Sequence, residues 1–218
     1  MAFDNGNDKM MKHLMIDIES TGIDPKVEDL LQVALLEIDF VDGYWHPGRS
    51  FNLFVHTDRK PTTEFALEHQ QGLYDECSRA MKRSMPEIRE AVLEFFALCG
   101  LTPPKDVFFA GWNASNFDVP FLVEKRVLRP PTYETVNGKD VMVGDFHYRV
   151  YELGGAVGLV QDVLQETLEE GRKKMTERAL DAAPGPELGN GIQHDALYDC
   201  YRQTRILNGL IALVRGQR

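Results

Sequence analysis

The sequence has little of what several classes of protein require. Its three cysteines, Cys77, Cys99 and Cys200, are widely spaced and form no C-x-x-C pair, so neither a disulfide framework nor a zinc site is indicated. The longest apolar runs, 95–99 and 210–214, are far shorter than the roughly 18 residues that a membrane span needs. The N-terminus lacks the apolar segment of a signal peptide. These absences predict a cytoplasmic protein with no membrane partner.

Positive charge is also scarce. The chain has 24 lysines and arginines against 34 aspartates and glutamates, which gives a formal net charge of −10. Proteins that coat duplex nucleic acid are normally basic, so broad electrostatic binding to DNA is not expected. A short or single-stranded nucleic acid held locally through metal ions is compatible with this charge. The 218 residues, with 43% apolar content, suit one sizeable core, so we expect a single domain over 1–218.

The hydrophobic pattern changes along the chain from strand-like to helical. The order of expected elements is strands at 12–18, 30–40 and 49–56, a helix after Ser84, a strand at 106–110, a helix at 117–128, a strand at 141–146, and helices at 152–168 and 195–214. Three strands with short connections indicate an antiparallel meander, and the alternation that follows indicates an α/β fold with a mixed sheet. We expect residues 1–11 to be disordered and 169–193, rich in glycine, proline and charge, to form a flexible insertion.

Two carboxylates interrupt the first strand-like segment, HLMIDIESTG at 13–22. Residues two apart in a strand point to the same face, so Asp17 and Glu19 project together. A solvent-facing edge would explain an alternation of this kind. However, the apolar residues before Asp17 indicate a central strand, in which two like charges are costly unless a cation or a proton compensates. Oxygen-only ligands suit Mg²⁺ or Mn²⁺, so the pair indicates a metal site.

Two further segments carry candidate polar residues. In GWNASNFDVPFL, Asp118 stands at an expected strand-to-helix transition, where it could also be a helix N-cap. In HDALYDC, Asp199 follows His194 by about one helical turn. Taken alone, a histidine of this kind is usually structural, and Asn113 in the first segment is ordinary loop chemistry. The order of the three segments carries more information than any one of them.

DIESTG, then N-x-x-x-F-D, then H-x-x-x-x-D, over roughly 12–214, resembles the three-motif pattern of the DEDDh 3′→5′ exonucleases, the DnaQ-like family. The resemblance implies a ribonuclease H-like fold with a mixed five-stranded sheet and helices on both faces. It implies two divalent metal ions, Mg²⁺ or Mn²⁺, held by Asp17, Glu19, Asp118 and Asp199. It also implies that His194 acts as the general base.

In that family, the loop after the first motif receives the terminal nucleotide. The resemblance therefore implies substrate contacts from Ser20, Thr21, Gly22 and Ile23, with the Thr21 hydroxyl near the 3′ hydroxyl. The alternative is a plain turn that ends the strand, because a turn would use the same residues. Asn113 of the second motif is a further expected substrate contact.

Among the branches of the family, the chain resembles oligoribonuclease and ribonuclease T. The segments HQQGL (69–73) and HYR (147–149) of this chain resemble segments of oligoribonuclease. In that enzyme the tyrosine and arginine of the HYR segment help to grip the 5′ phosphate across a homodimer interface, so the resemblance implies this role for Tyr148 and Arg149. His69 is a further expected substrate contact. Two hydroxyl-bearing residues of oligoribonuclease are replaced here by Gly154 and Gly155, which removes contacts expected for a strict dinucleotide preference.

The resulting hypothesis is a two-metal exonuclease that shortens single-stranded DNA or RNA, or short oligonucleotides, from the 3′ end and releases nucleoside 5′-monophosphates. Three alternatives stay open. The chain could be a non-catalytic nucleic-acid-binding module on the same fold. It could be an endonuclease on that fold. It could also be a proofreading subunit that acts with a separate polymerase. Nothing in the sequence separates RNA from DNA, because no side chain can be assigned to the 2′ hydroxyl.

Overall fold

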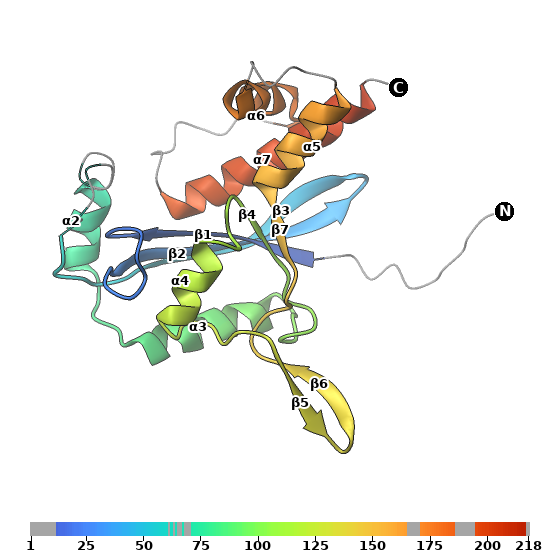
Figure 1. The fold of residues 1–218 in the computed structure, drawn as a ribbon. Helices are drawn as coiled ribbons and strands as arrows, with labels where there is room; N and C mark the ends of the chain where they lie inside the picture. Colours follow the sequence, from blue (N-terminus) through green and yellow to red (C-terminus); the bar gives the residue numbers. More distant parts are fainter. Residues whose placement is uncertain are drawn as a thin grey trace.

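A mixed sheet forms the centre of the molecule. The computed structural model describes residues 12–60, 62, 64, 67, 71–164, 171–185 and 195–216. The strands are β1 (Lys12–Ser20), β2 (Leu30–Val41), β3 (Tyr44–Phe54), β4 (Phe109–Gly111) and β7 (Val150–Glu152), in the spatial order β3-β2-β1-β4-β7 (Figure 1). The first three strands are antiparallel, whereas β4 pairs parallel to β1 and β7 pairs parallel to β4. The predicted five-stranded mixed sheet is therefore confirmed.

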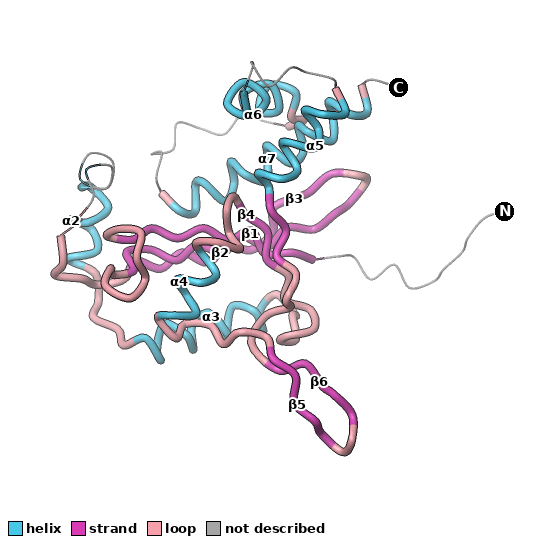
Figure 2. Tube along the Cα trace, viewed as in Figure 1, coloured by secondary structure: helices cyan, strands magenta, loops and turns pink. Residues whose placement is uncertain are grey.

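Helices cover both faces of this sheet (Figure 2). On one side lie α3 (Met85–Leu98) and α4 (Asp118–Glu124), and on the other lie α5 (Leu153–Val163) and α7 (Ala196–Arg215), with α6 (Gly171–Ala182) packed against α7. The short helix α2 (Gln71–Arg79) packs near one end of β2. A capping box of Ser84 and Glu87 marks the start of α3, in agreement with the helix predicted after Ser84.

The alternation of side chains along β1 divides the core. Leu14, Ile16 and Ile18 pack with the residues of α3 and α4 in the larger apolar cluster. Met15 packs in a second cluster with Cys200 of α7. Because side chains two apart share a face, the odd-numbered residues of β1 face α7. This division decides where the acidic pair of β1 points.

The segment 141–146 is not a strand of the main sheet, contrary to the sequence-based prediction. Residues Lys139–Val143 form β6, which pairs with β5 (Thr132–Val136) in a separate hairpin that projects from the body (Figure 1). The hairpin turns at Asn137 and Gly138, which both have positive φ angles, 52° and 72°. An Asn-Gly pair between alternating residues favours such a turn. The fifth strand is β7 instead, which begins after the HYR segment.

The segment 169–193 is not wholly a loop. Its described part, 171–185, contains α6, whose Met175 and Ala179 are buried against α5 and α7. The α6–α7 contact is close, since a Cβ added to Gly209 of α7 would lie 1.6 Å from the carbonyl oxygen of Ala179. The local sequence did not predict this helix because most of its residues are polar. Its few apolar residues are buried only against neighbours that the tertiary fold supplies. The prediction that 1–11 are disordered concerns residues outside the described part of the chain.

The third strand starts earlier than predicted. β3 begins at Tyr44, directly after a tight turn at Asp42 and Gly43, and it includes Pro47 and Gly48. A shift in the β2–β3 register between Leu36 and Ile38 accommodates this stretch. Proline is tolerated here because β3 is an edge strand, whose outer N–H groups need no partner in the sheet.

Candidate active site

The central strand β1 supplies two carboxylates to the face covered by α7. Asp17 is paired with Ala34 of β2 and Glu19 with Gln32, so both stand near the carboxyl end of β1. Glu19 is 7% exposed. The register of β1 and β2 shifts directly after Glu19, and this ends the regular strand where the next loop begins. The prediction that the two side chains share a face is consistent with this register.

Helix α7 brings the third carboxylate to the same place. Asp195 caps the helix by accepting a hydrogen bond from the Tyr198 N–H at 3.0 Å, and Asp199 lies in the first turn. Gln32 of β2 fastens this end of the helix, because its side-chain oxygen accepts the Ala196 N–H at 3.0 Å. Carboxylate oxygens of Asp17, Glu19 and Asp199 all lie within 4.8 Å of one another.

Asp118 joins β1 from the opposite layer. It is the first residue of α4, and its Oδ1 accepts the Ile18 N–H at 2.9 Å. Asp118 is therefore not the N-cap of α4, a position that Phe117 occupies. Burial, and to a smaller extent the nearby charge of Glu152, raise the pKa of Asp118 to about 7, although backbone hydrogen bonds from Ile18 and from Asp118 itself lower it in part. The carboxyl is only 3% exposed.

The acidic residues destabilise one another's charged forms. Burial, and then the charges of Asp118, Glu19 and Asp199, raise the pKa of Asp17 well above its ordinary value, although a hydrogen bond from Gln203 lowers it in part. A cluster of carboxylate oxygens at this spacing fits a hard divalent cation, whose charge would offset the repulsion. Asp17, Glu19 and Asp199 are the described residues that could hold such an ion.

Gln203 is a site residue that sequence reasoning missed. Its Nε2 donates to Asp17 Oδ1 at 2.9 Å, and its Oε1 accepts the Trp112 N–H at 2.9 Å. It therefore links α7, the end of β4 and the acidic cluster, and it is only 4% exposed. The available signal was its position four residues after Asp199, which places both on one face of the helix. Glu152, whose Oε1 accepts the Ser115 N–H at 2.6 Å, was also missed.

The loop after β1 bends tightly against its own neighbours. The Ser20 hydroxyl donates to the Gly22 carbonyl at 2.6 Å. The Thr21 hydroxyl is fully buried, donates to Glu28 at 2.7 Å and accepts the Asp29 N–H at 2.8 Å. Its hydrogen is thus already donated within the protein, and the contact of this hydroxyl with the substrate stays a prediction. Ile23 is 77% exposed, as a residue that contacts a ligand would be.

The remaining predicted contacts belong to a loop before α4, to the segment before β7, and to residues outside the described part of the chain. Asn113, with a φ of 60°, supports the loop before α4 by accepting the Phe117 N–H at 3.0 Å. Tyr148 and Arg149 precede β7, at the amino end of the parallel strands, whereas the carboxylates of β1 are near its carboxyl end. His69 and His194 lie outside the described residues.

Comparison with known proteins finds likeness in structure only. No family model and no curated protein sequence matches the chain. The structure of cell-death related nuclease 4 (CRN-4) matches with a TM-score of 0.64 at 16% identity, over 91% of this chain. The nuclease domain of 3′hExo, a DEDDh family member bound to rAMP, matches with a TM-score of 0.58 at 12% identity. That match covers 97% of this chain and 94% of the 3′hExo domain.

A third likeness is to a zinc-bound complex of E. coli ExoI with single-stranded DNA, with a TM-score of 0.57 at 16% identity over 96% of this chain. The chain spans 63% of the CRN-4 chain and 41% of the ExoI chain. The structural neighbours are thus 3′-exonucleases and related nucleases, and the chain shares their ribonuclease H-like fold. The predicted fold is confirmed. Within the described residues, no helix is both long and apolar enough to cross a membrane.

Proposed function

We propose that this chain is a metal-dependent 3′→5′ exonuclease acting on single-stranded or short oligonucleotides. One observation carries the proposal: Asp17, Glu19, Asp118 and Asp199, from three segments far apart in the sequence, converge at the end of one central strand. The nuclease fold of the structural neighbours supports the same assignment. A purely structural cluster of buried acids would lower stability without any return, since like charges repel strongly when shielded from water.

The four carboxylates would hold two divalent ions, Mg²⁺ or Mn²⁺. When bound, such ions activate the attacking water and stabilise the departing 3′ oxygen. The protein's own part is to fix geometry. Gln203 holds the Asp17 carboxylate through its hydrogen bond, and the Ile18 N–H holds that of Asp118. The loop at 20–23 would receive the terminal nucleotide, with the exposed Ile23 side chain against its base.

His194 is proposed as the general base that takes the proton from the attacking water. An imidazole with an ordinary pKa of about 6.5 is largely neutral at pH 7 and can accept that proton. The residue directly precedes Asp195, the N-cap of α7, and Asp199 lies in the first turn of that helix. This sequence position beside the helix start supports a role near the cluster.

The activity is tested with a 5′-labelled oligonucleotide in Mg²⁺, in Mn²⁺ and in EDTA. We expect stepwise shortening that requires the metal and that Asp17→Ala or Asp199→Asn abolishes. The matched control is Asp140→Asn, which removes an exposed aspartate on the β5–β6 hairpin. Full activity in either site variant would refute the assignment.

A circular single-stranded substrate separates the alternatives. An exonuclease leaves it intact because the molecule has no end, whereas an endonuclease on the same fold would open it. Tight binding of a linear oligonucleotide with no release of mononucleotides would favour a non-catalytic binding module. Rates on matched RNA and DNA, from two nucleotides to about twenty, then define the substrate, because only a contact to the 2′ hydroxyl distinguishes the sugars.

Tyr148 and Arg149 would serve this site only from a second copy of the chain. In the structure Tyr148 is 54% exposed, and the Arg149 guanidinium lies 5.6 Å from the centre of the Tyr148 ring. Both residues precede β7, at the end of the sheet opposite to the acidic cluster. We therefore propose a homodimer in which they reach the partner's substrate. Mixing inactive Asp17→Asn with Arg149→Ala in equal amounts would restore about a quarter of wild-type activity, because half of all dimers then pair the two variants and each of these carries one complete site out of two. No restoration would argue against this arrangement.

A further inference from the structure

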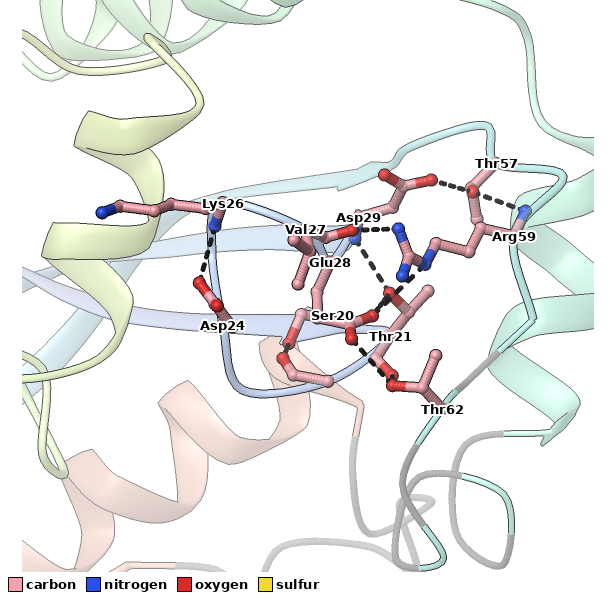
Figure 3. A network of polar contacts seen from close by, with 11 residues as sticks. Ser20, Thr21, Asp24, Lys26, Val27, Glu28, Asp29, Thr57, Arg59 and Thr62 are labelled. Atoms are coloured by element: carbon pink, nitrogen blue, oxygen red, sulfur yellow. Dashed lines mark hydrogen bonds and ion pairs between the residues drawn. The ribbon is translucent and has the colours of Figure 1, made fainter.

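The loop between β1 and β2 is shaped by a buried carboxylate that has no place in the acidic cluster. Glu28 is 7% exposed, and its two oxygens accept hydrogen bonds from different segments (Figure 3). Oε2 accepts the Thr21 hydroxyl at 2.7 Å, and Oε1 accepts the Thr62 hydroxyl at 2.8 Å. The Arg59 guanidinium lies 3.4 Å from Oε2. A single side chain therefore connects the start of the loop with residues 59 and 62.

Backbone contacts make Thr21 the fixed point of this loop. Its N–H donates to the Asp29 carbonyl at 2.9 Å, and its carbonyl accepts the Thr62 N–H at 2.9 Å. Its hydroxyl accepts the Asp29 N–H while donating to Glu28. Asp29 is held in turn by the Thr57 hydroxyl at 2.6 Å, as Figure 3 shows. Thr21 directly follows Ser20, the last residue of β1, so this fixing acts two residues from Glu19.

Gly22, the residue after Thr21, has no space for a side chain. A Cβ on Gly22 would lie 2.8 Å from the Glu28 carboxyl carbon and 2.8 Å from the Thr62 hydroxyl oxygen. The Gly22 backbone is therefore pressed against Glu28. Ile23 then points into solvent, 77% exposed. Within the part of the chain that the structure describes, the N–H groups of Gly22 and Ile23 donate no hydrogen bond to the protein.

Glu28 holds its charge despite burial. Burial alone raises the pKa of this carboxyl, but the hydrogen bonds from Thr21 and Thr62 and the charge of Arg59 outweigh it and hold the pKa below its ordinary value. The carboxylate is thus ionised at neutral pH, and hydrogen bonds to an ionised acceptor are about twice as strong as neutral ones. This strength suits a group that must hold an otherwise open loop.

We infer that Glu28 is a positioning residue. It holds the loop at 20–23 so that the Ile23 side chain and the backbone N–H groups of Gly22 and Ile23 meet the 3′-terminal nucleotide. The inference rests on the proposed function, since it assigns the seat of that nucleotide. Glu28 itself, being buried behind Gly22 and Thr21, would not touch the substrate. Its effect would pass through the backbone it holds.

The test compares Glu28→Gln with the wild-type protein in two assays. In Ca²⁺, anisotropy measures binding of a 5′-labelled oligonucleotide ending in a 3′ hydroxyl. We expect Glu28→Gln to weaken this binding about tenfold, because one strong hydrogen bond at the seat is exchanged for weaker ones. In Mn²⁺, kinetics should show a raised KM and a smaller change in kcat. The rise in melting temperature with increasing Mn²⁺ concentration should be the same in Glu28→Gln as in the wild-type protein, since Glu28 is outside the metal cluster.

Two controls separate positioning from loss of folding. Glu37→Gln removes another buried carboxylate, which Lys12 and Arg49 pair at the other end of β1, and should leave oligonucleotide binding unchanged. Thr21→Val should reproduce Glu28→Gln, and Thr21→Ser, which keeps the hydroxyl, should restore binding. In the double variant Glu28→Gln with Ile23→Ala, the losses of binding free energy should be less than additive, because both substitutions act on the same nucleotide-binding loop.

Unchanged oligonucleotide binding in Glu28→Gln, or full additivity with Ile23→Ala, would overturn the inference. Absence of binding by the wild-type protein would overturn it as well. Wild-type binding through this loop with no hydrolysis in Mg²⁺ or Mn²⁺ would instead uphold the positioning role and refute the exonuclease activity. The two proposals therefore fail in different assays.

Discussion

Asp17 illustrates at the scale of a single residue how a site can oppose the stability of the fold that carries it. Its carboxylate faces Glu19 and Asp199 within 4.8 Å, and its pKa is raised well above the ordinary value by burial and by its acidic neighbours. A divalent cation would reverse the sign of this interaction. Removing the charge of Asp17 should therefore make the metal-free protein more stable and the metal-loaded protein less stable.

Asp17→Asn tests this at the residue scale. In EDTA we expect the melting temperature to rise by about 2–4 °C, which corresponds to about 1 kcal/mol in a chain of this size. The gain in melting temperature on adding Mn²⁺ should be largely lost. Calorimetry with and without metal measures both. A fall in stability in EDTA would show that the Gln203 hydrogen bond to Asp17 outweighs the repulsion.

Asp118 predicts a dependence on pH. Because its pKa is about 7 in the folded chain, above the ordinary value near 3.8, the folded state binds its proton more tightly than the unfolded state. The contribution of Asp118 to stability is therefore present at low pH and is lost as pH rises from about 4 to 7. In EDTA, the wild-type protein should therefore lose free energy of unfolding relative to Asp118→Asn as the pH rises across this window. A constant difference would contradict the raised pKa.

The sequence shows some residues of the site better than others. Asp17, Glu19, Asp118 and Asp199 stand in short motifs whose local geometry constrains them. Gln203 and Glu28 depend on partners far along the chain, such as Trp112 and Thr62, and no spacing rule brings these together. The internal partner of the Thr21 hydroxyl could not be predicted for the same reason, since Glu28 reaches it only once the loop has folded.

At the scale of secondary structure elements, the meander and α7 follow from strong periodic patterns and tight turns. The errors fall where a short segment could pair with several partners. The apolar residues of β6 fit a central strand as well as a hairpin, and only the Asn137-Gly138 turn decides between them. Helix α6 depends on the surface that α5 and α7 offer, which no local pattern records.

The contact of α6 with α7 predicts the effect of a single methyl group. Gly209→Ala would place a Cβ against the Ala179 carbonyl, so we expect a loss of at least about 2 kcal/mol. Gly158→Ala in α5 is the control, because its Cβ meets nothing within 4 Å and alanine favours a helix by about 1 kcal/mol over glycine. Urea unfolding measures both. Equal stability of the two variants would show that α6 does not pack as described.

For the whole molecule, the net charge of −10 limits how substrate is held. Few phosphates can be neutralised by side chains, so most of the electrostatic attraction would come from bound metal. With two phosphate contacts or fewer, log(kcat/KM) should fall against log[KCl] with a slope no steeper than about −1.4. Rates at fixed Mn²⁺ across a range of KCl measure this. A slope beyond about −4 would indicate an extended basic surface.

Helix α7 also sets when the acidic cluster can be completed. The acidic cluster joins β1, made early in synthesis, to Asp199, made after every other strand and helix that the structure describes. A growing chain can pair β1 with β2 and β3, yet it holds an incomplete acidic cluster until α7 leaves the ribosome. In the proposed exonuclease, the order of synthesis would therefore delay hydrolysis until the last helix has folded onto the sheet.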